Sequence, residues 1–209
     1  MLANIINGIL HLDSYIGLLI ENYGLLTYII LFAIIFLETG LVITPFLPGD
    51  SLLFVVGAFA AQSSLSLVLL LTLLSAAAIL GDTLNYAIGS FFGSKLSSSR
   101  LINPLYLEKT KEFYRKYGGK TIILSRFVPI IRTFAPFVAG IGKMHYPKFL
   151  TFNIIGGCVW VFLFVLAGYF FGSIPLVKEN LTIVILLIII ISIVPIAIEI
   201  ARSRFRGKA

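Results

Sequence analysis

The first 94 residues of this 209-residue chain contain no lysine and no arginine. They hold five acids, a formal charge of −5, whereas residues 95 to 209 hold all sixteen bases and four acids, which gives +12. Charged residues are only 12% of the chain and hydrophobic residues 59%, with a mean hydropathy of +1.05. A soluble domain could not cover its surface with so few charges. The composition therefore predicts an integral membrane protein.

Further absences exclude several classes of function. The single cysteine, Cys158, permits no internal disulfide and no zinc cluster, so we expect no metal site and no cofactor. The sequence has no HExxH, GxSxG or histidine-bearing phosphatase motif, so we expect no catalytic residues and no enzyme activity. The bases lie beside apolar spans, which argues against nucleic acid as a partner.

Long uncharged stretches indicate the architecture. At about 20 apolar residues per crossing, the chain predicts one all-α polytopic transmembrane domain, residues 1–209, with about four full transmembrane helices. The uncharged stretches are 22–37, 51–81, 149–177 and 180–198.

Two apolar segments are too broken for straight crossings, and we interpret both as re-entrant hairpins, at about 44–61 and 120–140. Backbone that breaks at membrane depth must be buried in protein or line a wet cavity. The sequence Phe46-Leu47-Pro48 recurs as Phe127-Val128-Pro129, and residues 89–94 (GSFFGS) recur as 168–173 (GYFFGS). One crossing between two such hairpins would invert the second, so we expect an inverted repeat with opposed hairpins. The expected breakers are Pro45, Pro48, Gly49, Pro129 and Pro136.

The positions of the bases predict the orientation. Thirteen of the sixteen lie in three segments, 95–120, 143–148 and 202–208, which the positive-inside rule places in the cytoplasm. Both termini are then cytoplasmic. Within the basic segment 95–120 we expect an amphipathic helix, between Asn103-Pro104 and Gly118-Gly119, on the anionic inner leaflet. A plain solvated helix is the alternative.

Five charged residues fall inside or at the tips of the expected membrane segments: Glu38, Asp50, Asp82, Arg126 and Arg132. Each would cost about 2.5 to 3.5 kcal/mol at the centre of a membrane helix, so each needs a partner, water or a function. Glu38 and Asp50 are candidates for proton coupling. Asp50 also suits a helix cap, which is compatible with a ligand site at a half-helix terminus.

The polar face around Asp82 and the two arginines each have two possible interpretations, one functional and one structural. Asp82, Asn85 and Tyr86 share one helical face, where they could line a pathway or hold helices together. Arg126 and Arg132 carry planar guanidinium groups suited to a phosphate, although structural pairing with the two acids is an alternative. Trp160 and the glycine pairs of the repeated segments are interpreted as helix packing.

Taken together, these residues resemble the DedA family of bacterial membrane proteins, also called SNARE-associated or VTT-domain proteins. The resemblance implies two opposed re-entrant hairpins, a bacterial cytoplasmic membrane, and a role in moving lipids, with relatives implicated in recycling undecaprenyl phosphate and in proton-dependent envelope integrity. The family's essential acids match Glu38 and Asp50, and its essential arginines match Arg126 and Arg132. The matching segments are 36–40 (FLETG), 45–51 (PFLPGDS), 81–86 (GDTLNY) and 125–136 (SRFVPIIRTFAP).

Our leading hypothesis is a proton-coupled translocase of undecaprenyl phosphate. Its partners would be membrane lipids, above all a phosphorylated lipid headgroup, and protons, with homo-oligomerisation left open. The alternatives are a proton-coupled exporter of small cations or drugs, a flippase for phosphatidylethanolamine or another phospholipid, and a structural or assembly role without transport.

Overall fold

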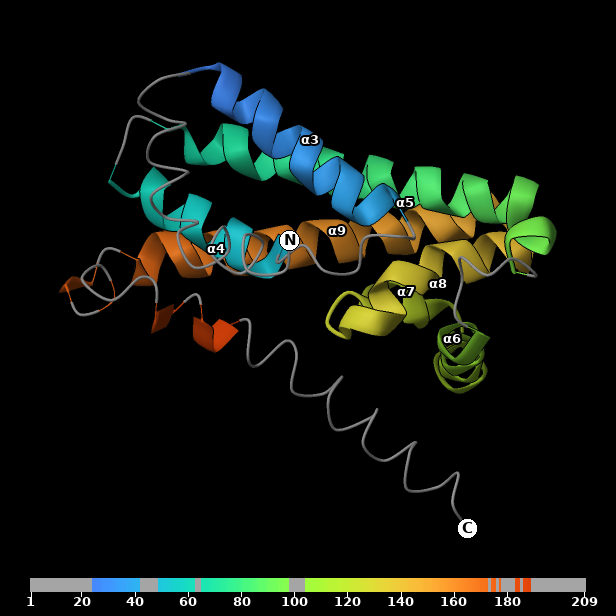
Figure 1. The fold of residues 1–209 in the computed structure, drawn as a ribbon. Helices are drawn as coiled ribbons and strands as arrows, with labels where there is room; N and C mark the ends of the chain where they lie inside the picture. The colour runs from blue at the N-terminus through green and yellow to red at the C-terminus, as the bar shows by residue number, and fades with distance from the viewer. Residues whose placement is uncertain are drawn as a thin grey trace, which may run out of the picture.

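The computed structural model describes residues 24–41, 49–62, 65–97 and 104–172, with a few residues between 174 and 188. These residues form helices and turns and include no strand, in agreement with the predicted all-α class (Figure 1). The elements are α3 (Leu26–Gly40), α4 (Gly49–Ala60), α5 (Leu67–Ser97), α6 (Pro104–Tyr117), the 3-10 turn η1 (Gly118–Lys120), α7 (Thr121–Ser125), α8 (Pro129–Ile141) and α9 (Tyr146–Phe171).

Two helices are long and apolar enough to cross a membrane. They are α5, over Leu67–Phe92, and α9, over Tyr146–Phe171. They run antiparallel (Figure 1), since Tyr86 of α5 stacks on Phe149 near the start of α9. The 15 residues of α3 span about 22 Å, less than a hydrocarbon core of about 30 Å. The fourth expected span, 180–198, lies mostly outside the described residues, and the basic tail 202–208 lies wholly outside them.

The short helix α4 packs in parallel against α9 through two glycines. A Cβ atom on Gly57 would overlap the carbonyl oxygen of Val165, and one on Gly168 would overlap that of Phe54. The backbones of the two helices therefore touch, as the glycine spacing in α9 predicted.

The short helix α8 packs in the same way against α5. Gly89 lies against the carbonyl of Phe137, and Gly140 lies against the carbonyl of Tyr86. Each short helix thus crosses the long helix of the other half of the chain. Because α4 begins near the middle of α9 and α8 begins near the middle of α5, the two short helices start close together and run in opposite directions (Figure 1).

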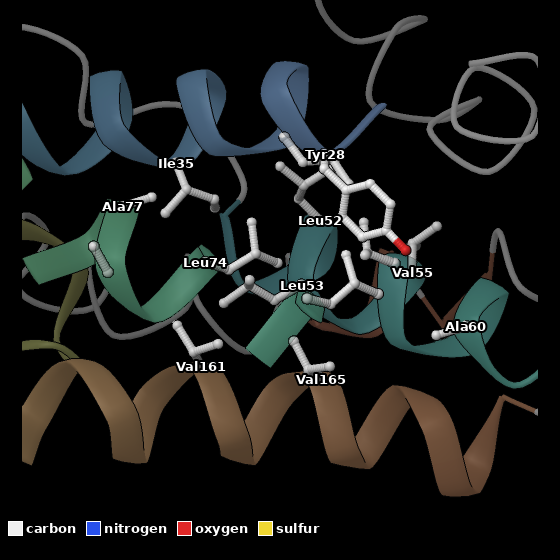
Figure 2. Packing of buried hydrophobic residues seen from close by; sticks show 14 of the residues in the cluster. Tyr28, Ile35, Leu52, Leu53, Val55, Ala60, Leu74, Ala77, Val161 and Val165 are labelled. Atoms are coloured by element: carbon white, nitrogen blue, oxygen red, sulfur yellow. The ribbon is translucent and has the colours of Figure 1, made fainter. Parts of the chain in front are cut away.

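The main apolar core lies between α3, α4, α5 and α9 (Figure 2). Ile35, Leu53 and Val161 are fully buried there. The rim of this core is held by a hydrogen bond in which the Ser66 backbone N–H donates to the Tyr28 hydroxyl over 2.7 Å. Burial of these side chains fixes α3 and α4 against the long helices, and so fixes the ends of both at the centre of the structure.

The two prolines of α8 occupy different positions in the helix. Pro129 begins α8, directly after the extended residue Val128. Pro136, which we expected to break the chain, lies inside α8, and the helix continues to Ile141. Side chains from α5 and α6 donate to the carbonyls of Thr133 and Ala135, which lie just before the proline in α8. Pro45 and Pro48 lie outside the described residues.

The predicted amphipathic helix is present as α6, which begins at Pro104 and ends at Tyr117. Its Tyr114 hydroxyl donates to the carbonyl of Ala135 over 2.9 Å, and this contact ties α6 to α8. Burial raises the pKa of the Tyr114 hydroxyl, which keeps it a proton donor. The location of α6 on the inner leaflet stays a prediction.

Replacing Gly168 with Ala should destabilise the protein strongly, because the added methyl group overlaps the α4 backbone. Overpacking of this kind costs about 1–3 kcal/mol. Gly140→Ala, at the reciprocal crossing, should behave alike. Thermal unfolding in detergent measures both. The control is Gly142→Ala, whose new Cβ would lie 3.3 Å from its nearest neighbour, the carbonyl of Val138. Equal stability of all three variants would contradict the described crossings.

Candidate functional site

Three helix ends meet at the centre of the structure, and each carries a charged side chain. Glu38 lies in the last turn of α3, Asp50 in the first turn of α4 and Arg132 in the first turn of α8. The guanidinium of Arg132 donates from Nη2 to Glu38 Oε1 and from Nη1 to Asp50 Oδ1, each over 3.0 Å. We call these three residues the Arg132 cluster. Its side chains are 13%, 7% and 16% exposed for Arg132, Glu38 and Asp50, so water reaches them only slightly.

Gly49 completes the environment of Glu38. Its backbone N–H donates to Glu38 Oε1 over 3.2 Å. A Cβ at position 49 would collide with the Glu38 carboxylate, so a larger side chain there would displace the carboxylate. The residue predicted as a chain breaker therefore also forms part of the site.

Trp160, in the middle of α9, is the largest fully buried side chain of the described residues. Its indole N–H donates to Asp50 Oδ1 over 2.8 Å. Its ring lies beneath the guanidinium of Arg132, with Cζ 4.0 Å from the ring centroid. Its place in an apolar span predicts only packing for Trp160, and the structure adds two polar contacts.

A second buried ion pair lies beside the first. Arg126 is 2% exposed, and its Nη2 donates to Asp82 Oδ2 over 2.5 Å and to Asn153 Oδ1 over 2.7 Å. Gly156 and Gly157 of α9 leave room for this side chain. We call Arg126, Asp82 and Asn153 the Arg126 cluster. Within the described part of the chain, Arg126 Nε and Nη1 have no hydrogen-bond partner.

The polar face of α5 ties helices together. The Asn85 amide donates to the carbonyls of Thr39 and Thr133 over 3.3 and 2.9 Å, which joins α3, α5 and α8. The Tyr86 hydroxyl donates to the carbonyl of Met144. These bonds fit the second of the two interpretations given for this face of α5, in which its side chains hold helices together.

The structure thus divides the five predicted charges into two clusters. Glu38 and Asp50 converge on Arg132, whereas Arg126 pairs with Asp82. Sequence reasoning missed Asn153, although a lone amide within the uncharged stretch 149–177 was a signal that something polar faces it. Across the described ranges, no group of three or more His, Cys, Asp or Glu side chains could hold a metal ion.

Comparison with known proteins places the chain in a family. The VTT-domain family model matches residues 47–170, which is more than half of the chain and contains four of the five charged residues. The chain is 54% identical to protein DedA of Escherichia coli K12 over 205 residues, 96% of this chain and 94% of that protein. The chain belongs to the DedA, or VTT-domain, family.

Other DedA-family relatives are more distant. A membrane protein of Mycobacterium tuberculosis is 43% identical over 174 residues, 81% of this chain and 76% of that protein. The inner membrane protein YqjA of Escherichia coli is 33% identical over 151 residues, 71% of this chain and 69% of that protein. No solved structure matches the chain.

Replacing Asp82 with Ala should destabilise the protein by about 3–5 kcal/mol, because it leaves the Arg126 guanidinium buried without its counter-ion. The double variant Asp82→Ala, Arg126→Leu should recover part of this loss. Chemical unfolding in detergent measures the difference.

The control for Asp82 is the exposed pair of Arg115 and Glu108 in α6, whose side chains are 70% and 53% exposed. Glu108→Ala should cost less than about 1 kcal/mol. If Asp82→Ala were no more destabilising than Glu108→Ala, the Arg126 cluster would not be a buried ion pair.

Proposed function

We propose that this DedA-family protein translocates undecaprenyl phosphate across the bacterial cytoplasmic membrane for envelope biogenesis, coupled to protons. The observation that carries the proposal is the Arg132 guanidinium, held between the carboxylates of Glu38 and Asp50 at the meeting point of three helix ends. The proposed activity is transport and includes no catalytic step.

The chemistry of Arg132 suits a phosphate. A guanidinium presents paired N–H donors in a plane, and carboxylate and phosphate oxygens accept them in the same geometry. A phosphate headgroup can therefore take the donors that Glu38 and Asp50 occupy. This exchange gives the site a substrate-free state and a loaded state.

The helix starts add to the attraction for an anion. The positive ends of the helix dipoles of α4 and α8 lie at the Arg132 cluster, since Asp50 and Arg132 belong to their first turns. Half-helices that start at mid-membrane and point their N-termini at a substrate anion are a recurring transporter design. The reciprocal glycine crossings support re-entrant hairpins in an inverted repeat, and we propose that architecture.

Charge balance links the substrate to protons. Glu38, Asp50 and Arg132 sum to a formal charge of −1, and a phosphate headgroup adds one or two further negative charges. In a site with so little water, that excess is unfavourable unless protons are taken up. Glu38 and Asp50, which lose Arg132 to the phosphate, are the groups placed to take them.

The lipid tail would stay in the bilayer during transport. The outer face of α9 exposes apolar side chains over several turns, including Ile155, Val159 and Leu163, as a lipid-facing helix does. The site chemistry supports a phosphate headgroup, and the family resemblance supports undecaprenyl phosphate among the phosphate lipids.

One observation favours a second candidate. The net charge of −1 in the Arg132 cluster would also attract a cation, as in a proton-coupled exporter of small cations or drugs. In that case Arg132 would supply only a positive charge to the site, and the variant Arg132→Lys would keep full activity. A phosphatidylethanolamine flippase would instead keep the need for Arg132 and prefer the zwitterionic lipid.

The relatives and the charge pattern support a proposed location. Several relatives are named membrane or inner membrane proteins. We propose the same membrane for this chain, with both termini in the cytoplasm, because thirteen bases lie in the segments placed there.

The test uses proteoliposomes that contain a fluorescent polyprenyl phosphate, with a reductant outside that quenches only the outer leaflet. Wild type should accelerate exchange between the leaflets. Arg132→Ala should abolish the acceleration, and Arg132→Lys should reduce it at least tenfold, because a single ammonium cannot replace the planar fork.

The matched control is Arg115→Ala, which removes an exposed arginine of α6 and should leave the rate unchanged. Fluorescent phosphatidylethanolamine in parallel vesicles separates the lipid alternatives. Wild-type rates with Arg132→Ala would contradict the proposal, and full activity of Arg132→Lys would favour the cation exporter.

A further inference from the structure

Trp160 contacts both members of the ion pair between Asp50 and Arg132. The indole N–H and Arg132 Nη1 both donate to the same oxygen, Asp50 Oδ1, over 2.8 and 3.0 Å. The face of the same ring supports the guanidinium of Arg132 at 4.0 Å. Filling space in the core would require only an apolar ring, so packing alone does not account for the indole N–H at this position.

The two contacts use parts of the ions that a phosphate does not need. Stacking occupies the face of a guanidinium and leaves its N–H edge available to an incoming anion. The indole N–H faces Asp50 and remains there when Arg132 turns its donors to another acceptor. The ion pair can therefore open while each ion keeps a contact with Trp160.

We propose that Trp160 is a positioning residue for substrate binding: it holds Asp50 and Arg132 in place while an anionic phosphate headgroup separates them. This inference rests on the proposed function, and it assigns a role in the exchange to a residue outside the charged set. The ring also lies 5.9 Å from Cζ of Arg126, so it borders the second cluster as well.

The proposal predicts an effect on binding more than on maximal rate. Removing the indole N–H takes one donor from Asp50 both with and without substrate. The loss is larger in the loaded state, because Arg132 then donates to the phosphate, Glu38 takes up the proton, and fewer donors face the Asp50 carboxylate. A perturbation that harms the loaded state more than the free state weakens substrate affinity.

The experiment compares Trp160→Phe with Phe164→Leu in the proteoliposome assay, over a range of mole fractions of fluorescent polyprenyl phosphate. Trp160→Phe keeps a ring beneath Arg132 and loses the N–H. Its half-saturating mole fraction should rise about three- to tenfold, because only the difference between the losses in the loaded and free states changes the affinity, with a maximal rate within about twofold of wild type. Trp160→Leu, which also loses the ring, should raise it further.

Phe164 is the matched control, since it packs edge-on against Trp160 with ring centroids 6.4 Å apart and lies against the apolar core. Phe164→Leu should lower the melting temperature and leave the half-saturating mole fraction unchanged. An unchanged half-saturation in Trp160→Phe, or an equal rise in Phe164→Leu, would overturn the assignment.

A second measurement separates this inference from the proposed function. Melting temperatures of Trp160→Phe, Asp50→Ala and the double variant form a cycle that requires no transport. We expect the fall in melting temperature of the double variant to be smaller than the sum of the two single falls, because each change removes the same hydrogen bond between Trp160 and Asp50. Additive losses would overturn the inference even if transport is observed, whereas coupling without wild-type transport would mean that the proposed function has failed.

Discussion

A single guanidinium, that of Arg132, joins the ends of three helices through two ion pairs. Its two Nη atoms reach the last turn of α3 and the first turn of α4 from the first turn of α8. Burying such a charge is costly unless it is paired and hydrogen-bonded, so the three helix ends must remain together or the site must open to water or substrate. The glycine crossings of α4 on α9 and of α8 on α5 make the meeting possible, because they let the short helices start at the middle of the long ones.

The two arginines differ in accessibility, and this difference separates their roles. Arg126 is 2% exposed and lies between Asp82 and Asn153, behind glycines of α9. Arg132 is 13% exposed at its side chain and is bound to two acids that come from separate helices. We therefore propose that Arg132 exchanges with the substrate and that Arg126 positions α7 against α5 and α9. Trp160 borders both guanidinium groups and so connects the Arg126 cluster with the Arg132 cluster.

Much of the fold and part of the site could be predicted from the sequence. The helical class, the two long apolar helices, the start of α8 at Pro129 and the bounds of α6 follow from local patterns of hydropathy, proline and glycine. The pairing of Arg126 with Asp82 rather than with Glu38 or Asp50 could not be predicted, because it depends on which helices cross. Near Pro136, through which α8 continues, side chains from two other helices donate to its carbonyls, and such tertiary donors leave no local pattern. The polar contacts of Trp160 are likewise tertiary, since an indole in an apolar span gives no local sign that its N–H meets a carboxylate.

The central claim is that a phosphate headgroup takes Arg132 from its carboxylates, which then accept protons. Calorimetric titration of the detergent-solubilised protein with a short-chain polyprenyl phosphate, repeated in buffers of different ionisation enthalpy, counts the protons taken up on binding. We expect the wild-type protein to take up at least about one proton per bound headgroup. The Glu38→Gln variant should still bind the headgroup and take up fewer protons. Binding that takes up the same number of protons in wild type and in Glu38→Gln would contradict the account.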